Sequence, residues 1–310
     1  MTTPLVLITC RQMQVELPHY RSTIESLGYR VHAPALNGRQ QFSATELLEY
    51  SQDLVGIVAG DDELSQEFFD GCPNLKTVIR WGIGMDSVDL SAARDHGVTV
   101  RNTPGVFGGE VADMAFGYIL NLARGHASID AAVRNGQWPS REGVSLAGKK
   151  LGIIGFGAIG QEVAKRGKGF DMQICVYDPY TKNTDPEVLF VELDELLESS
   201  HFVVLACPLS PETFHLINAS RLTLMRPDSF LINVARGPVV SESDLVNALR
   251  EHQIAGAALD VFETEPLPLD SELREFPHLI LGAHNASNTR EGVVRASRIA
   301  IDFLIEELTK

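Results

Sequence analysis

The sequence predicts an α/β protein of two domains, each a doubly wound parallel sheet covered by helices. Three observations lead to this prediction. Short β-branched runs alternate with helical segments along the chain. A long apolar helix at 109–124 separates two such series, and a glycine-rich turn opens the second. A length of 310 residues also fits about two domains.

The first series occupies the first third of the chain. Strands buried on both faces of a parallel sheet are apolar at nearly every position, so continuous apolar runs indicate them. We expect strands at 5–10, 29–33, 54–59, 75–80 and 98–101, with helices at 17–27, 45–51 and 65–70.

The segment 109–124 differs from its surroundings. Val111, Ala115, Tyr118 and Leu122 recur at helical spacing, and the reverse face of this helix is also largely apolar. This pattern predicts a long buried helix between the two domains.

The second series follows a polar segment at 135–148. We expect strands at 150–155, 173–178, 201–207, 229–234, 256–262 and 278–283, with helices at 159–170, 193–199, 241–252 and 289–308. Ser241 is the expected N-cap of its helix, and Asp244, three residues on, suggests a near capping box.

Composition excludes several classes of function. A formal net charge of −15 repels a phosphate backbone, so we expect no nucleic-acid partner. The apolar runs are too short to span a membrane, and the N-terminus lacks the pattern of a secretory signal. We assign no metal site. The 4 cysteines are scattered in or beside apolar runs, which predicts buried, reduced thiols in a cytoplasmic protein: Cys10, Cys72, Cys175 and Cys207.

The sharpest local signal is the segment GFGAIG, directly after an apolar strand. Gly155 allows a tight turn, Gly157 lets backbone approach a pyrophosphate, and Gly160 lets helix and strand pack closely. The next strand ends at Asp178, where a carboxylate can bind the adenosine ribose hydroxyls. An acid there would repel a 2′-phosphate, which favours NAD over NADP.

Four chemically capable residues follow strands of the second series: Arg236, Asp260, Glu265 and His284. Ligands of doubly wound sheets collect outside the carboxyl ends of the strands, so these residues could converge on a nicotinamide pocket. Hydride removal from a carbinol carbon needs a base for the hydroxyl proton, a carboxylate can orient that base, and a guanidinium can hold a substrate carboxylate. Taken singly, each residue also fits a structural role in a loop.

The motifs together resemble one enzyme family. In order, the segments GFGAIG, VYDPY, CPLSPET, NVARGPVV, ALDVFETEP and AHNAS resemble the D-isomer-specific 2-hydroxyacid dehydrogenases, and most of all their phosphoglycerate dehydrogenase branch. Residues 80–89 are similar to the family's glycine loop, and residues 102–105 to its hinge segment.

This resemblance implies a split architecture. A flavodoxin-like substrate domain would comprise residues 1–100 plus 289–310, and a Rossmann-type NAD-binding domain, residues 101–288, would be inserted in it. The family's domains close over cofactor and substrate, and the NAD domains pair to form a homodimer.

The resemblance also implies roles for individual residues. Arg236 would bind the substrate carboxylate, His284 would be the acid and base, and Glu265, rather than Glu263, would be its partner. Substrate would also meet the backbone of Gly82 and Ile83. The cofactor contacts implied for the second domain are Gly155, Gly157, Ala158, Ile159, Gly160, Asp178, Cys207, Pro208, Val234, Ala235, Asp260 and Ala286.

The implied activity is hydride transfer between NAD(H) and a small 2-hydroxy or 2-oxo acid, with D-3-phosphoglycerate as first candidate. Glyoxylate or hydroxypyruvate reduction is the same-class alternative, and a non-catalytic NAD-sensing module, as in corepressors of this fold, is an alternative of another class. Two departures bear on a phosphate-bearing substrate. The segment 58–60 lacks the Arg-Ser of phosphoglycerate dehydrogenases, and Phe107 replaces a polar residue, so Arg80 or Arg11 would have to supply the charge.

Overall fold

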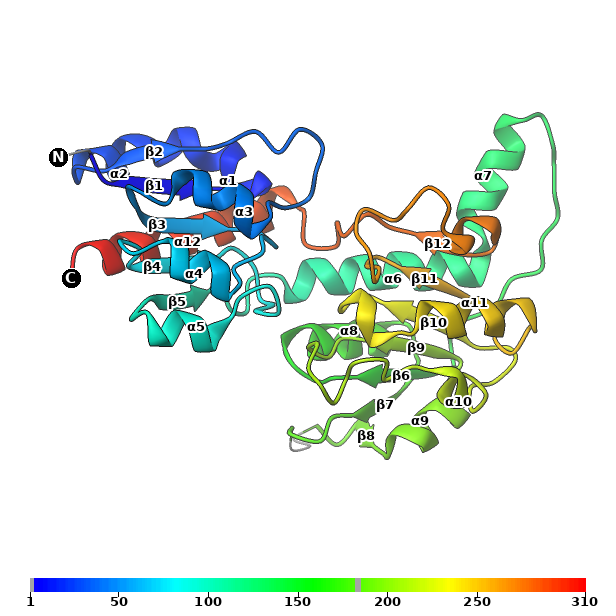
Figure 1. The fold of residues 1–310 in the computed structure, drawn as a ribbon. Helices are drawn as coiled ribbons and strands as arrows, with labels where there is room; N and C mark the ends of the chain where they lie inside the picture. Colours follow the sequence, from blue (N-terminus) through cyan, green and yellow to red (C-terminus); the bar gives the residue numbers. More distant parts are fainter. Residues whose placement is uncertain (1–2, 182–184) are drawn as a thin grey trace. The chain divides into compact units, whose positions relative to one another are not determined.

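A computed structural model describes residues 3–181 and 185–310 of the chain (Figure 1). The chain divides into two compact units: unit 1 comprises Met1–Val106 and Asn288–Lys310, and unit 2 comprises Phe107–Ser287. The predicted division between residues 100 and 101 would fall inside a strand of unit 1. The assignment of unit 1 to substrate stays a prediction.

Unit 1 contains a five-stranded sheet in the order β2-β1-β3-β4-β5. All of its strand pairs are parallel, and the order is that of flavodoxin-like folds. The strands are β1 (Leu5–Ile8), β2 (Arg30–His32), β3 (Leu54–Ala59), β4 (Thr77–Arg80) and β5 (Thr99–Asn102).

The C-terminal helix belongs to unit 1, where it packs against β3, β4 and β5. Trp81 donates from its indole N–H to Ser297 Oγ at 3.0 Å, and the Tyr29 hydroxyl donates to the Leu308 carbonyl at 2.9 Å. The α-helices of the unit are α1 (Arg11–Glu16), α2 (Arg21–Ser26), α3 (Ala44–Leu47), α4 (Gln66–Gly71), α5 (Leu90–Asp95) and α12 (Arg290–Leu308), with 3-10 turns at Leu17–His19 and Leu48–Tyr50.

Unit 2 contains a seven-stranded sheet in the order β12-β11-β10-β9-β6-β7-β8. Its strand pairs are all parallel, and the order reverses between β6 and β9, as in Rossmann folds. The predicted fold class is therefore confirmed. The strands are β6 (Lys150–Ile154), β7 (Gln173–Tyr177), β8 (Val188–Phe190), β9 (Phe202–Leu205), β10 (Phe230–Asn233), β11 (Gly256–Leu259) and β12 (Ile280–Leu281).

The long helix expected at 109–124 is α6, which lies in unit 2 and packs on α8, β10 and β11. A Cβ at Gly108 would lie 2.9 Å from the Ala158 carbonyl oxygen, so glycine lets α6 approach α8 closely. The helices of unit 2 are α6 (Gly108–Arg124), α7 (His126–Arg134), α8 (Ala158–Gly169), α9 (Leu193–Ser199), α10 (Ala219–Leu222) and α11 (Glu242–Arg250), with 3-10 turns at Gly237–Val239 and Glu272–Glu275.

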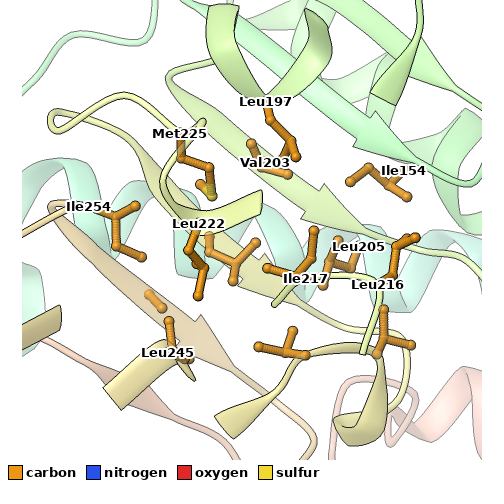
Figure 2. Close-up of a cluster of buried hydrophobic side chains, with 14 of the residues drawn as sticks. Ile154, Leu197, Val203, Leu205, Leu216, Ile217, Leu222, Met225, Leu245 and Ile254 are labelled. Carbon is orange, nitrogen blue, oxygen red and sulfur yellow. The ribbon is translucent and has the colours of Figure 1, made fainter. Parts of the chain in front are cut away.

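A large apolar cluster holds the loops that follow β9 and β10 onto the sheet of unit 2. Figure 2 shows part of it, with side chains from strands, helices and the connecting segment at 216–217 meeting in one core. Its labelled members are Ile154, Leu197, Val203, Leu205, Leu216, Ile217, Leu222, Met225, Leu245 and Ile254.

The capping box expected at α11 is wrong. Ser241 is the N-cap, but its side chain makes no capping hydrogen bond. Its hydroxyl lies 3.3 Å from Ser243 Oγ, and Asp244 Oδ2 accepts the Ala219 N–H at 2.9 Å. Asp244, which the local pattern assigned to the cap, therefore accepts a hydrogen bond from the first residue of α10 instead.

The prediction of buried, unpaired cysteines is confirmed for all four. Burial raises the pKa of the Cys207 thiol to about 11, so this thiol is neutral at physiological pH. In the described part of the chain, no helix combines the length and apolarity that a bilayer crossing needs.

Candidate cofactor and catalytic site

The strand order of unit 2 reverses between β6 and β9, and the glycine-rich turn lies at this point. Gly155 follows β6 with φ +94°, a conformation that favours glycine. A Cβ on Gly155 would lie 2.7 Å from the Cys207 Cα, so the turn packs directly on the backbone that follows β9. The structure therefore brings together two of the residues that were predicted to contact the cofactor, Gly155 and Cys207.

The N-terminus of α8 is open to a ligand. Gly157 and Ala158 are exposed, and no atom lies within 4 Å of the position a Gly157 Cβ would take. Gly160, by contrast, has no room for a side chain, because a Cβ added there would lie 2.1 Å from the Gly155 carbonyl oxygen. Exposed backbone at the start of a 12-residue helix is suited to a pyrophosphate, so these residues fit a dinucleotide.

Asp178 follows β7 and its carboxylate faces this turn. Oδ2 accepts the Phe156 N–H at 2.7 Å, and Oδ1 accepts the N–H groups of Tyr180 and Thr181 at 2.8 and 2.9 Å. Although burial acts to raise the pKa of Asp178, these backbone donors outweigh it and lower the pKa. The side chain is therefore a fixed anion beside the glycine turn.

Asp260 is almost fully buried and holds two other elements in place. Its Oδ1 accepts the Tyr118 hydroxyl at 2.7 Å, and its Oδ2 accepts the Ala286 N–H at 2.9 Å. Burial and the Asp260 charge raise the pKa of Tyr118, which keeps its hydroxyl a donor. The Asp260 carbonyl also accepts the His284 N–H at 2.7 Å, so Asp260 positions the segment 284–286.

The turn after β10 carries Arg236. Asn233 bridges this turn with its amide, because Nδ2 donates to the Arg236 carbonyl at 2.9 Å and Oδ1 accepts the Ala235 N–H at 3.0 Å. A Cβ on Gly237 would lie 1.9 Å from the Phe262 carbonyl carbon and oxygen. The Arg236 turn therefore rests directly on the backbone after β11.

Glu265 and His284 lie in contact. Glu265 Oε2 is 2.7 Å from His284 Nδ1, and Oε1 accepts the Phe262 N–H at 2.9 Å. The two side chains are 19% and 23% exposed, so the pair is half-buried and still reachable. Since a carboxylate only accepts, Nδ1 carries the proton and donates it to Glu265.

A second cluster beside this pair was not predicted from the sequence. His215 Nε2 lies 3.0 Å from Glu263 Oε1, which also accepts the Glu242 N–H at 3.0 Å. Glu242 Oε1 in turn accepts the Glu263 N–H at 2.7 Å. The cluster ties the segment that bears Glu265 to α11 and to the loop after β9. His215 and Glu242 carry no sequence signal, because their contacts come from distant segments.

The substrate residues predicted in unit 1 are Arg80, the last residue of β4, and Gly82 and Ile83, in the turn that follows it. Gly82 has φ +139°, and its N–H donates to Thr103 Oγ1 at 2.9 Å. The Asn102 amide donates to the Ile83 carbonyl at 2.7 Å. Arg80 is buried and donates to Asp61 and to the Trp81 carbonyl.

The family model for the "D-isomer specific 2-hydroxyacid dehydrogenase, NAD binding domain" matches residues 116–286, more than half of the chain. The chain belongs to the D-isomer-specific 2-hydroxyacid dehydrogenases. The dehydrogenase is thus an NAD-dependent oxidoreductase that acts on CH–OH groups, and the predicted family and cofactor are confirmed.

Three relatives illustrate the similarity. A glyoxylate reductase of Thermofilum pendens is 41% identical over 257 residues, which is 80% of this chain and 76% of the relative. A D-3-phosphoglycerate dehydrogenase of Methanocaldococcus jannaschii is 36% identical over 264 residues, 83% of this chain but 50% of the relative. The structure of an NAD-dependent formate dehydrogenase of Staphylococcus aureus in complex with NAD is similar with a TM-score of 0.88 and 28% identity. The match covers 99% of this chain and 96% of the formate dehydrogenase chain.

Proposed function

We propose that this dehydrogenase reduces small 2-oxo acids of the glyoxylate and hydroxypyruvate class with NADH, and oxidises the corresponding 2-hydroxy acids in reverse. The observation that carries the proposal is the contact between Glu265 and His284 at the carboxyl ends of β11 and β12. This pair supplies the proton that the reduction of a carbonyl requires.

His284 acts as the acid in reduction. Its Nδ1–H is held by Glu265, so the ring orientation is fixed and the protonated imidazolium is stabilised. Nε2 then gives its proton to the developing alkoxide, and in oxidation it takes the hydroxyl proton back. The αL backbone of His284, with φ +48°, is held by the hydrogen bond to the Asp260 carbonyl.

Arg236 binds the substrate carboxylate in this proposal. A guanidinium matches a carboxylate with two parallel hydrogen bonds and can polarise the adjacent carbonyl. The Asn233 bridge and the Gly237 contact hold the backbone of its turn.

The nicotinamide cofactor supplies or accepts the hydride. The α8 N-terminus, with Gly157, Ala158 and Ile159, would hold the pyrophosphate, and Asp178 would hold the adenosine ribose. The fixed charge of Asp178 supports a preference for NADH over NADPH, because it would repel a 2′-phosphate. The nicotinamide contacts proposed for this domain are Cys207, Pro208, Val234, Ala235, Asp260 and Ala286.

Two observations support glyoxylate and hydroxypyruvate over the first expectation, D-3-phosphoglycerate. Similar relatives that match most of this chain include glyoxylate reductases, at 41% identity in Thermofilum pendens. Arg80, one of the two arginines named as a possible source of charge for a phosphate, is buried against Asp61. D-3-phosphoglycerate stays the second candidate, supported by the relative in Methanocaldococcus jannaschii.

A panel of 2-oxo and 2-hydroxy acids tests the proposal. The readout is consumption of NADH or NADPH with the 2-oxo acids and their formation from the oxidised cofactors with the 2-hydroxy acids. We expect the highest kcat/KM for glyoxylate or hydroxypyruvate with NADH. A higher kcat/KM for the phosphorylated acid would favour the second candidate. Absence of turnover with every acid would refute the proposal and favour the NAD-sensing alternative. The homodimer and the cytoplasmic location predicted from the sequence are part of the same proposal.

A further inference from the structure

The guanidinium of Arg80 packs against the backbone of the turn that follows β4. Its side chain is 5% exposed, and Nη1 donates to the Trp81 carbonyl. A Cβ on Gly82 would lie 2.3 Å from Nη1 and 3.0 Å from Cζ of this arginine, so the guanidinium lies directly on the Gly82 backbone. Arg80 Nε is buried without a hydrogen-bond partner among the described residues. A buried positive charge therefore lies directly against the Trp81–Gly82 backbone.

Asp61 is the acid that neutralises this charge. It follows β3, is 27% exposed, and forms an ion pair with Arg80 Nη2. The neighbouring Asp62 has other partners, because it accepts the Thr9 hydroxyl at 2.5 Å and the N–H groups of Phe42 and Gly60 at 2.8 and 2.9 Å. Burial raises the pKa of Asp62, which makes it a weaker counter-charge.

We propose that Asp61 is a specificity-determining residue: by pairing with Arg80 beside the Gly82 backbone, it selects 2-oxo acids whose only anionic group is the carboxylate. The inference rests on the proposed function and on the expectation that the substrate meets the backbone of Gly82 and Ile83. A substrate with a second anionic group would gain from a free arginine here and gains little from a neutralised one. The arginine itself acts as a positioning residue for the Trp81–Ile83 backbone.

The test compares two substrates in Asp61→Asn. We measure kcat/KM with NADH for hydroxypyruvate and for the same acid carrying a phosphate on C3. Removal of the negative charge leaves that of Arg80 uncompensated, so the ratio of phosphorylated to unphosphorylated acid should rise about tenfold. Asp61→Glu keeps the charge and should keep the ratio. Glu67→Gln, on the exposed face of α4, removes the same charge elsewhere in unit 1 and should also keep it.

A ratio that stays unchanged in Asp61→Asn while hydroxypyruvate is still reduced would overturn the inference and leave the proposed function standing. A tenfold rise in Glu67→Gln would also overturn it, since net charge alone would then explain the effect. Asp61→Ser provides a second variant if the asparagine variant fails to fold, and the same rise is expected. Inactivity of the unmodified enzyme on both acids would refute the proposed function and the inference together.

Discussion

The contact between Gly237 and the backbone of Phe262 makes a sharp prediction for Gly237→Ala. The new methyl carbon would lie 1.9 Å from Phe262 backbone atoms and 2.4 Å from the Glu263 nitrogen. Ordinary contact begins near 3.4 Å, so the two segments must separate by roughly 1.5 Å. One of these segments bears Arg236 and the other leads to Glu265. A displacement of about 1 Å in a catalytic group can cost about 100-fold in rate, so we expect kcat/KM to fall at least that far.

The assay separates this effect from a loss of cofactor binding. NADH binding, followed by fluorescence titration, should weaken far less than kcat/KM falls, because the proposed pyrophosphate and ribose contacts, at 157–159 and Asp178, lie on other segments than Gly237. Overpacking should also lower the unfolding free energy by about 1–3 kcal/mol. Gly117→Ala is the matched control, since a Cβ there meets no atom within 4 Å and alanine favours a helix. Near-normal kcat/KM in Gly237→Ala would refute the reasoning.

Two further predictions concern charges in unit 2. Glu265→Gln removes the carboxylate that lies 2.7 Å from His284 Nδ1 and orients this ring, so kcat for reduction should fall while NADH binding changes little; an unchanged kcat would contradict this. Asp178→Ala should weaken NADH binding and reduce the preference over NADPH in titrations, and equal binding of both cofactors by the unmodified enzyme would contradict the assigned role. The pKa of Asp178 is lowered in the folded state, so the Asp178 carboxylate stabilises the fold above about pH 4, and this contribution is lost as the pH falls further. The melting temperatures of Asp178→Ala and of the unmodified enzyme should therefore converge in acid.

The strands could be read from the sequence because burial on both faces of a parallel sheet leaves continuous apolar runs. Residues 54–59 form β3 with the predicted bounds. The six-residue helices α1 and α5 were missed, because each buries few residues and has no long apolar stripe. β8 was missed for a similar reason, since it is a three-residue edge strand with one buried side chain.

The candidate site was only partly readable from the sequence. Residues in the loops that follow strands, such as Glu265 and His284, could be found because parallel strands bring their carboxyl ends to one edge. Supporting groups such as Tyr118 could not be assigned, since Tyr118 reads as one apolar position on α6 and its contact with Asp260 spans 142 residues. Asp61 has no motif of its own, and its pairing with Arg80 depends on the neighbouring positions of β3 and β4 in the sheet.

Proton exchange between His284 and the substrate is the central step of the proposed reaction. The most direct test measures kcat for the best substrate of the panel and the dissociation constant of NADH in His284→Ala. We predict that kcat falls by about 10²–10⁴-fold while NADH binding changes little, because the histidine acts in proton transfer rather than in holding the cofactor. A kcat close to that of the unmodified enzyme would contradict the assignment.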